Sequence, residues 1–149
     1  AGGGAIVMVG SLAGLAPLQG AATYSATKAG LRAFTYALAD ELRGTGINVG
    51  VVSPGPIPTG FIIAEIDQVE DIVFSQPMTS AEQVADAVLA LAAGVRTEIT
   101  LPGFSGRLAT LGYLFPSLRR RMRKSLYAKG RKNKAAYVRE IQGKLSGKS

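Results

Sequence analysis

The sequence predicts an α/β fold in which short apolar strands alternate with longer helices. Two apolar runs, at 6–9 and 48–53, have the length of buried strands, and the run at 96–101 looks like a last strand. The segments 24–43 and 81–93, which lie between these runs, are predicted to be helices. A strand that leads through a helix to the next strand is the pattern of a parallel sheet.

The elements of the first half are bounded by residues that break regular structure. After the strand at 6–9, the segment 12–23 is predicted to be a loop because it contains glycines and a proline. The helix at 24–43 ends at the glycines that follow it, since glycine readily closes a helix. The second strand, 48–53, runs into Pro54, which has no backbone donor with which to continue a sheet.

The second half contains one more strand and helix before the composition changes. The segment 61–78 has apolar residues mostly at helical spacing. Thr79 or Ser80 then caps the helix at 81–93, with acidic residues in or near its first turn. The last strand is expected at 96–101.

A small set of chemically distinctive residues follows the first two strands. Ser11 comes directly after the first strand, and Tyr24 and Lys28 are four residues apart on one face of the following helix. The second strand ends in the run Pro54-Gly55-Pro56-Ile57-Pro58-Thr59. Taken singly, these residues could be a turn serine, two solvated helix residues and a turn that ends a strand.

In this order and at these distances, the residues together resemble the Ser…Tyr-x-x-x-Lys and Pro-Gly-x-x-x-Thr motifs of the short-chain dehydrogenase/reductase family. The resemblance implies the C-terminal half of a Rossmann-like, doubly wound parallel sheet. It implies an enzyme that interconverts an alcohol and a carbonyl by hydride transfer with NAD or NADP. The sequence does not distinguish the two cofactors, because the residues that select between them belong to the family's first half.

The resemblance also assigns roles to residues. Tyr24 would be the general acid/base, and the ammonium of Lys28 would favour its phenolate and bind the ribose of the nicotinamide. Ser11 would donate a hydrogen bond to the substrate oxygen, which Tyr24 also contacts. Pro54 and Gly55 would bring the backbone close to the cofactor, with Ile57 at the carboxamide and Thr59 at the carboxamide or pyrophosphate.

The resemblance covers roughly residues 4–102, so we expect a partial catalytic domain at 1–102, from the family's fifth strand onward, and a tail at 103–149. No glycine-rich phosphate-binding turn and no Asn-Asn-Ala-Gly segment is present. We therefore expect a fragment that lacks half of the cofactor site and one edge partner for its first strand. The family's segment corresponding to 61–78 covers the substrate, and its apolar residues suit either a hydrophobic substrate or the core.

The tail is set apart by its charge. Residues 103–149 hold thirteen basic residues and one acidic residue, whereas residues 1–102 hold four basic and nine acidic. Its apolar residues recur at steps of three or four, with a break expected at Pro116. The tail could pack on the body or on a second subunit, or it could contact a membrane surface through 105–132. Its apolar stretches are too short to span a membrane. Nucleic acid is disfavoured as a partner because no recognition motif appears.

Two function classes stay open. The first is the oxidoreductase, acting on a small alcohol or ketone; family members that act on lipids favour a hydrophobic one. The second is a non-catalytic remnant that binds a partner or a membrane through the tail. The absence of cysteine and histidine argues against a disulfide framework, a metal site and Ser-His-Asp chemistry. We expect a cytoplasmic protein, and the small residues of the helix at 24–43 suit either sheet packing or a homo-oligomer.

Overall fold

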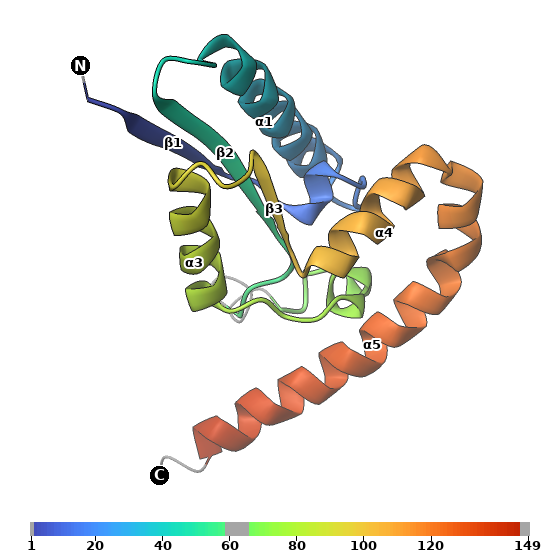
Figure 1. Ribbon diagram of the computed structural model, residues 1–149. Helices are drawn as coiled ribbons and strands as arrows, with labels where there is room; N and C mark the ends of the chain where they lie inside the picture. Colours follow the sequence, from blue (N-terminus) through green and yellow to red (C-terminus); the bar gives the residue numbers. More distant parts are fainter. Residues whose placement is uncertain (1, 59–65, 147–149) are drawn as a thin grey trace.

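The computed structural model describes residues 2–58 and 66–146 of the chain. Its centre is a parallel sheet with the strand order β1-β2-β3, formed by β1 (Gly4–Val9), β2 (Ile47–Pro54) and β3 (Glu98–Leu101). Helices α1 (Ala22–Glu41) and α3 (Ala81–Ala92) lie on opposite sides of this sheet (Figure 1). The predicted α/β fold with a parallel sheet is confirmed.

The hydrophobic core lies between the sheet and α3. Val52 and Leu91 are fully buried, and Ala87 completes the centre of the cluster. A Cβ at Gly50 would lie 2.8 Å from the Leu91 side chain, so α3 approaches the sheet closely only because Gly50 has no side chain. Burial of a leucine such as Leu91 stabilises the fold by about 1.5–3 kcal/mol. The cluster is extended by partly buried neighbours: Val7, Val84, Val88, Ile99 and Leu101.

The ends of the helices largely follow the sequence. Ser80 caps α3 as predicted: its side chain accepts from the backbone N–H of Gln83, whose own side chain accepts from the backbone N–H of Ser80. Helix α1 begins at Ala22, two residues before the predicted start at Tyr24. The predicted loop between β1 and α1 contains a short 3₁₀ turn, η1 (Leu12–Gly14).

The outer edge of β1 is uncovered in the described part of the chain. β1 pairs with β2 along its length, and Val9 at its end is half exposed. The sheet therefore offers an unpaired strand edge of the kind that other proteins cover with a further strand.

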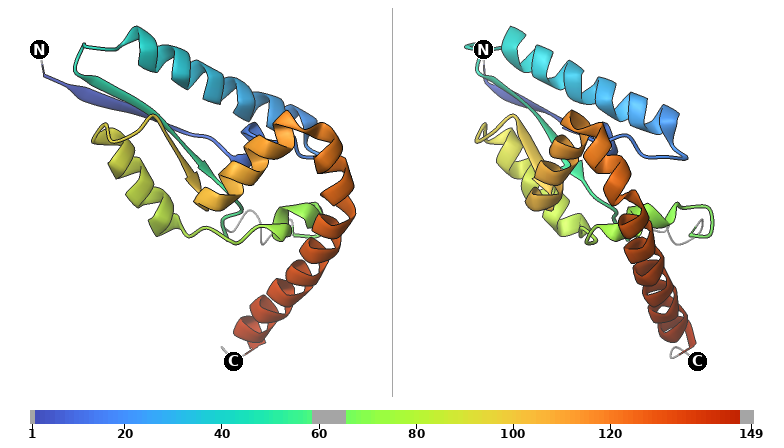
Figure 2. Two further views of the ribbon diagram at one scale, coloured as in Figure 1. Left: turned by 45° about the vertical axis from the view of Figure 1, so that its right-hand side comes forward. Right: turned by 90° about the vertical axis from the view of Figure 1, so that its right-hand side faces the viewer.

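The basic tail forms two helices. Helix α4 (Gly103–Leu114) follows β3 directly, and α5 (Pro116–Ser146) begins at the proline where a break was predicted. α4 packs against β3, because a Cβ at Gly106 would overlap the side chain of Thr100. Figure 2 shows α5 passing the body of the fold and projecting beyond it. No helix among the described residues is long and apolar enough to cross a membrane.

The middle of α5 packs on a second 3₁₀ turn, η2 (Asp71–Ser75). A Cβ at Gly130 would overlap the carbonyl oxygen of Asp71, so the two backbones touch. Asn133 donates to the carbonyl oxygen of Phe74 at 2.9 Å, and the ring of Tyr137 lies 6.2 Å from that of Phe74. The tail thus packs on the body here, and Phe74, one of the apolar residues of 61–78, is part of this buried contact.

Candidate active site

Tyr24 and Lys28 lie one turn apart near the start of α1. The Lys28 Nζ is 5.7 Å from the centroid of the Tyr24 ring and donates to the carbonyl oxygen of Val9 at 2.9 Å. Val9 is the last residue of β1, so this bond ties the helix to the carboxyl end of the strand. Tyr24 is about half exposed, at 47%. The ammonium is therefore tied to the end of β1, while about half of the Tyr24 side chain stays accessible.

Ser11 begins the 3₁₀ turn η1, and its side chain accepts from the backbone N–H of Ala13 at 3.2 Å. This turn lies directly on α1, because a Cβ at Gly14 would come within 2.8 Å of the carbonyl group of Lys28. The loop that follows is also fixed to the helix, since the backbone N–H of Leu18 donates to the buried Ser25 hydroxyl at 3.0 Å. The turn with Ser11 and the helix with Tyr24 and Lys28 are thus one packed unit.

The segment after β2 reaches the same edge of the sheet. The backbone N–H of Gly55 donates to the carbonyl oxygen of Leu101 at 2.7 Å, and a Cβ at Gly55 would lie 3.4 Å from the Leu12 side chain of η1. Pro54 and Pro56 are buried and Ile57 is half-buried. Thr59, the last residue of the predicted motif, lies outside the described residues.

The three predicted segments therefore meet at the carboxyl edge of β1 and β2, which is where ligands of open parallel sheets bind. Ser11 follows β1, Gly55 follows β2, and Lys28 bonds the end of β1. The catalytic and cofactor-binding roles of these residues stay predictions. What the geometry provides is a hydroxyl, a phenol and an ammonium on two elements that pack on each other.

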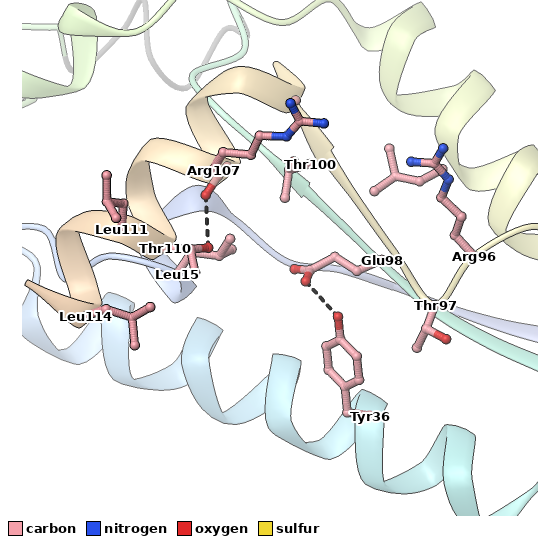
Figure 3. Close-up of a pocket in the computed structure, with 13 residues that line it drawn as sticks. Leu15, Tyr36, Arg96, Thr97, Glu98, Thr100, Arg107, Thr110, Leu111 and Leu114 are labelled. Carbon is pink, nitrogen blue, oxygen red and sulfur yellow. Dashed lines mark hydrogen bonds between the residues drawn. The ribbon is translucent and has the colours of Figure 1, made fainter.

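A polar cluster that the sequence analysis did not identify lies behind this edge. Glu98 of β3 accepts from Arg32 and Tyr36 of α1, and from Ser53 at 3.1 Å (Figure 3 draws the Tyr36 bond). Arg32 and Tyr36 stand four and eight residues after Lys28, so they continue its helix face toward the sheet. The cluster anchors α1 to β2 and β3. A charged residue in a strand of only four residues, Glu98–Leu101, was the signal that could have revealed it.

The ionisation of this cluster follows from its contacts. Burial alone would raise the pKa of Glu98, but hydrogen bonds from Arg32, Tyr36 and Ser53, with the charge of Arg32, hold that pKa below its ordinary value. Burial raises the pKa of Tyr36, and its bond to Glu98 adds to the rise. Glu98 is therefore a structural carboxylate that is ionised at neutral pH.

A cavity of about 620 Å³ lies beside the cluster, between α1, β3 and α4 (Figure 3). Tyr36 and Glu98 form one side, and Arg107 and Leu111 of α4 form the other. None of Ser11, Tyr24 and Lys28 lines it. This cavity is thus separate from the candidate catalytic residues.

Comparison with known proteins relates the first part of the chain to one family. The family model described as short chain dehydrogenase matches residues 1–70. An acetoacetyl-CoA reductase from Allochromatium vinosum is 35% identical over 106 residues, which are 66% of this chain and 43% of that protein. A 3-oxoacyl-(acyl-carrier-protein) reductase from Salmonella typhimurium is 39% identical over 101 residues, which are 65% of this chain and 41% of that protein. The chain thus spans less than half the length of these relatives.

Solved structures agree with the sequence relatives. A short chain dehydrogenase from Burkholderia cenocepacia in complex with NADP matches with a TM-score of 0.62 at 26% identity, over 81% of this chain and 48% of that one. A short chain dehydrogenase from Mycobacterium paratuberculosis bound to NAD matches with a TM-score of 0.58 at 25% identity, over 70% of this chain and 46% of that one.

Proposed function

The chain belongs to the short-chain dehydrogenase/reductase family, and we propose that it supplies the catalytic part of an NAD(P)-dependent oxidoreductase that interconverts an alcohol and a carbonyl. The observation that carries the proposal is the position of Lys28. Its ammonium contacts both the Tyr24 ring and the carbonyl oxygen that ends β1. An amine held at this point can act on the phenol and on a ligand at the sheet edge at the same time.

The proposed chemistry uses three side chains. In the direction of reduction, the Tyr24 hydroxyl gives its proton to the carbonyl oxygen of the substrate, and Lys28 stabilises the phenolate that is left. The Ser11 Oγ already accepts from Ala13, which leaves its O–H free to donate to the same substrate oxygen. In the direction of oxidation, the phenolate takes the proton of the alcohol.

The nicotinamide cofactor, NAD or NADP, would donate or accept the hydride when bound. The end of β2 fits its approach, because Gly55 is held in the sheet by Leu101 and carries no side chain that would fill the space next to Leu12. An ammonium has three N–H donors, so the bond to Val9 leaves two at Lys28 for the ribose hydroxyls and the phenol. Pro54, Gly55, Ile57 and Thr59 would complete this side of the cofactor site.

The substrate that we propose is a 3-oxoacyl thioester or a related small ketone. The relatives named above reduce acetoacetyl-CoA and 3-oxoacyl groups on acyl carrier protein, according to their names. An acyl chain also agrees with the apolar residues of 61–78, of which Ile66 and Ile72 are half-buried rather than fully buried. We further propose a homo-oligomer, because the exposed face of α1 carries small residues around Phe34, which is 52% exposed.

Turnover by the full-length protein tests the enzyme proposal. The wild type and Tyr24→Phe are assayed with NADH or NADPH and a 3-oxoacyl thioester by the absorbance of the reduced cofactor. We expect Tyr24→Phe to lose roughly 10²- to 10⁴-fold in kcat/KM, which is the usual contribution of a general acid/base. Tyr137→Phe is the matched control, because it removes the same hydroxyl from α5, far in sequence from Tyr24, and it should keep full activity. Equal activity of wild type and Tyr24→Phe would defeat the proposal.

A second candidate function is peripheral membrane contact through 105–132. Leu114 and Phe115, where α4 meets α5, are 65% and 54% exposed, and they lie next in sequence to a run of arginines. Exposed apolar side chains beside cations suit an anionic lipid surface. Flotation with anionic vesicles checks this, and the double variant Leu114→Ser/Phe115→Ser should float less than wild type. Absence of wild-type protein from the vesicle fraction would remove this candidate.

A further inference from the structure

A second cavity, of about 480 Å³, lies between the start of α1, the loop that precedes it and the start of α5. Opposite α5 the lining is mostly apolar and includes Pro17, Leu18, Ala22 and Ile72, and we call this side the floor. Its other wall is cationic, because Arg119, Arg120 and Arg123 of α5 all line it. We call this cavity the arginine pocket.

The arginines of the pocket face the body and not only the solvent. Arg119, Arg123 and Gly130 follow one another at steps that keep them on one side of α5, and Gly130 touches the backbone of Asp71. Arg123 lies over the ring of Tyr127, with 5.4 Å from its guanidinium carbon to the ring centroid. Its guanidinium therefore has a preferred position at the rim of the pocket.

These guanidinium groups have no carboxylate partner in the part of the chain that the structure describes. Among the described residues, Arg131 and Lys134 of α5 form ion pairs with Asp71 of the body. Glu70 accepts from the hydroxyl of Tyr127, which lines the pocket, at 3.3 Å, and among the described residues it forms no ion pair with the arginines. Like charges that share one wall repel each other, so an anion in the pocket would lower the electrostatic energy of the arginines.

We propose that the arginine pocket binds the phosphate group of an organic phosphate. Guanidinium groups match phosphate oxygens with paired hydrogen bonds, and several of them suit a group of more than one negative charge. The apolar floor provides contact for the organic part of such a ligand. Among the described residues that line the pocket, Tyr127 has a carboxylate contact, with Glu70, and that contact leaves the arginines without an ion pair there.

The pocket shares a wall with the candidate active site. Ala13 and Gly14 of η1 line it, while Ser11 caps the same turn and Gly14 lies on the backbone of Lys28. A ligand whose phosphate binds here can therefore reach past η1 toward the sheet edge. The identification of the ligand as the thioester substrate rests on the proposed function. The proposal of a phosphate-binding site does not depend on that function.

Direct binding of coenzyme A, measured by calorimetry on the full chain, tests the proposal without turnover. We expect Arg119→Gln and Arg123→Gln each to weaken binding about tenfold, the effect of one lost charged hydrogen bond. Arg121→Gln is the matched control, because it removes the same charge from an exposed residue of the same helix that does not line the pocket. Pantetheine, which has no phosphate, should bind at least about tenfold more weakly than coenzyme A.

A variant without a charge change completes the test. Ala22→Leu places a larger side chain on the floor of the pocket and should also weaken coenzyme A binding. Equal losses in Arg121→Gln and Arg123→Gln would show a diffuse attraction and overturn the proposal. So would equal binding of pantetheine, or binding that is confined to vesicles of phosphatidic acid. Because coenzyme A binding is measured without turnover, a failure here stays distinct from a failure of the catalytic proposal, which the activity of Tyr24→Phe tests.

Discussion

The guanidinium of Arg32 donates to both carboxylate oxygens of Glu98, with nitrogen–oxygen distances from 2.7 to 3.1 Å. The bond joins α1 to the edge strand β3, and Ser53 of β2 donates to the same carboxylate. Since α1 also carries Tyr24 and Lys28, this pair sets the position of the candidate catalytic helix against the sheet.

Glu98→Gln should destabilise the fold. The amide cannot accept the paired bonds of Arg32 with the strength of a carboxylate, and we expect a loss of about 2 kcal/mol in the free energy of unfolding, given that Glu98 is mostly buried. Urea unfolding measures the loss. Asp86→Asn, an exposed carboxylate on α3, should change stability by less than about 0.5 kcal/mol. Similar losses in the two variants would contradict a structural role for the cluster.

The contribution of Glu98 should depend on pH. Its pKa in the folded state lies below the ordinary value of 4.5, so its ionised form stabilises the fold fully above that value. The stability is lost as the pH falls through the lower pKa of the folded state, because the carboxylate is then protonated. The difference in unfolding free energy between wild type and Glu98→Gln should therefore shrink on acidification. A difference that grows below pH 4.5 would contradict this sign.

Gly130→Ala should loosen α5 from η2. The new Cβ would overlap the Asp71 carbonyl oxygen, which outweighs the better helix propensity of alanine. Hydrogen exchange of residues 69–75 should become faster. A loss of about 1.4 kcal/mol in the free energy of local opening corresponds to about a tenfold faster exchange. At Gly143 of the same helix a Cβ would meet nothing within 4 Å, so Gly143→Ala should leave this exchange unchanged. Unchanged exchange in Gly130→Ala would show that the helix does not hold the turn.

Phe34→Glu should dissociate the proposed homo-oligomer. A carboxylate in place of an exposed ring on α1 would be desolvated in any contact that covers this face. Light scattering of the full-length protein should show a smaller mass for the variant at equal concentration. Leu89→Glu is the control, because Leu89 is 68% exposed on α3, away from α1. Equal masses of wild type and Phe34→Glu would exclude this face as the interface.

The main helices and strands could be predicted from the sequence because residues next to them in the chain mark where they begin and end. Ser80 and Gln83 fix the start of α3, and Pro116 fixes the start of α5. The start of α1 was predicted two residues late, since Ala21, its N-cap residue, makes no side-chain capping bond that could mark it. The order of Ser11, Tyr24 and Lys28 was likewise readable, because their spacing is local to one strand and one helix.

Contacts between distant segments could not be predicted in this way. Glu98 meets Arg32 across 66 residues, and no periodic pattern relates the two. The missing side chain of Gly130 is what lets α5 reach Asp71, and nothing near Gly130 in the sequence indicates that contact. The arginine pocket depends on the path of α5 around the fold, which the charge of the tail does not specify.

The contact of Gly14 with Lys28 has a consequence for how such a protein can change its preference for ligands. Because the turn that follows Ser11 has no room to slide on α1, the proposed catalytic residues Ser11, Tyr24 and Lys28 belong to one fixed unit. A change in ligand preference would have to come from the flanking elements, which are α5 and the turn η2 that it packs on. On the proposed function, exchanging tails between homologous chains would change the arginine pocket while Ser11, Tyr24 and Lys28 keep their positions.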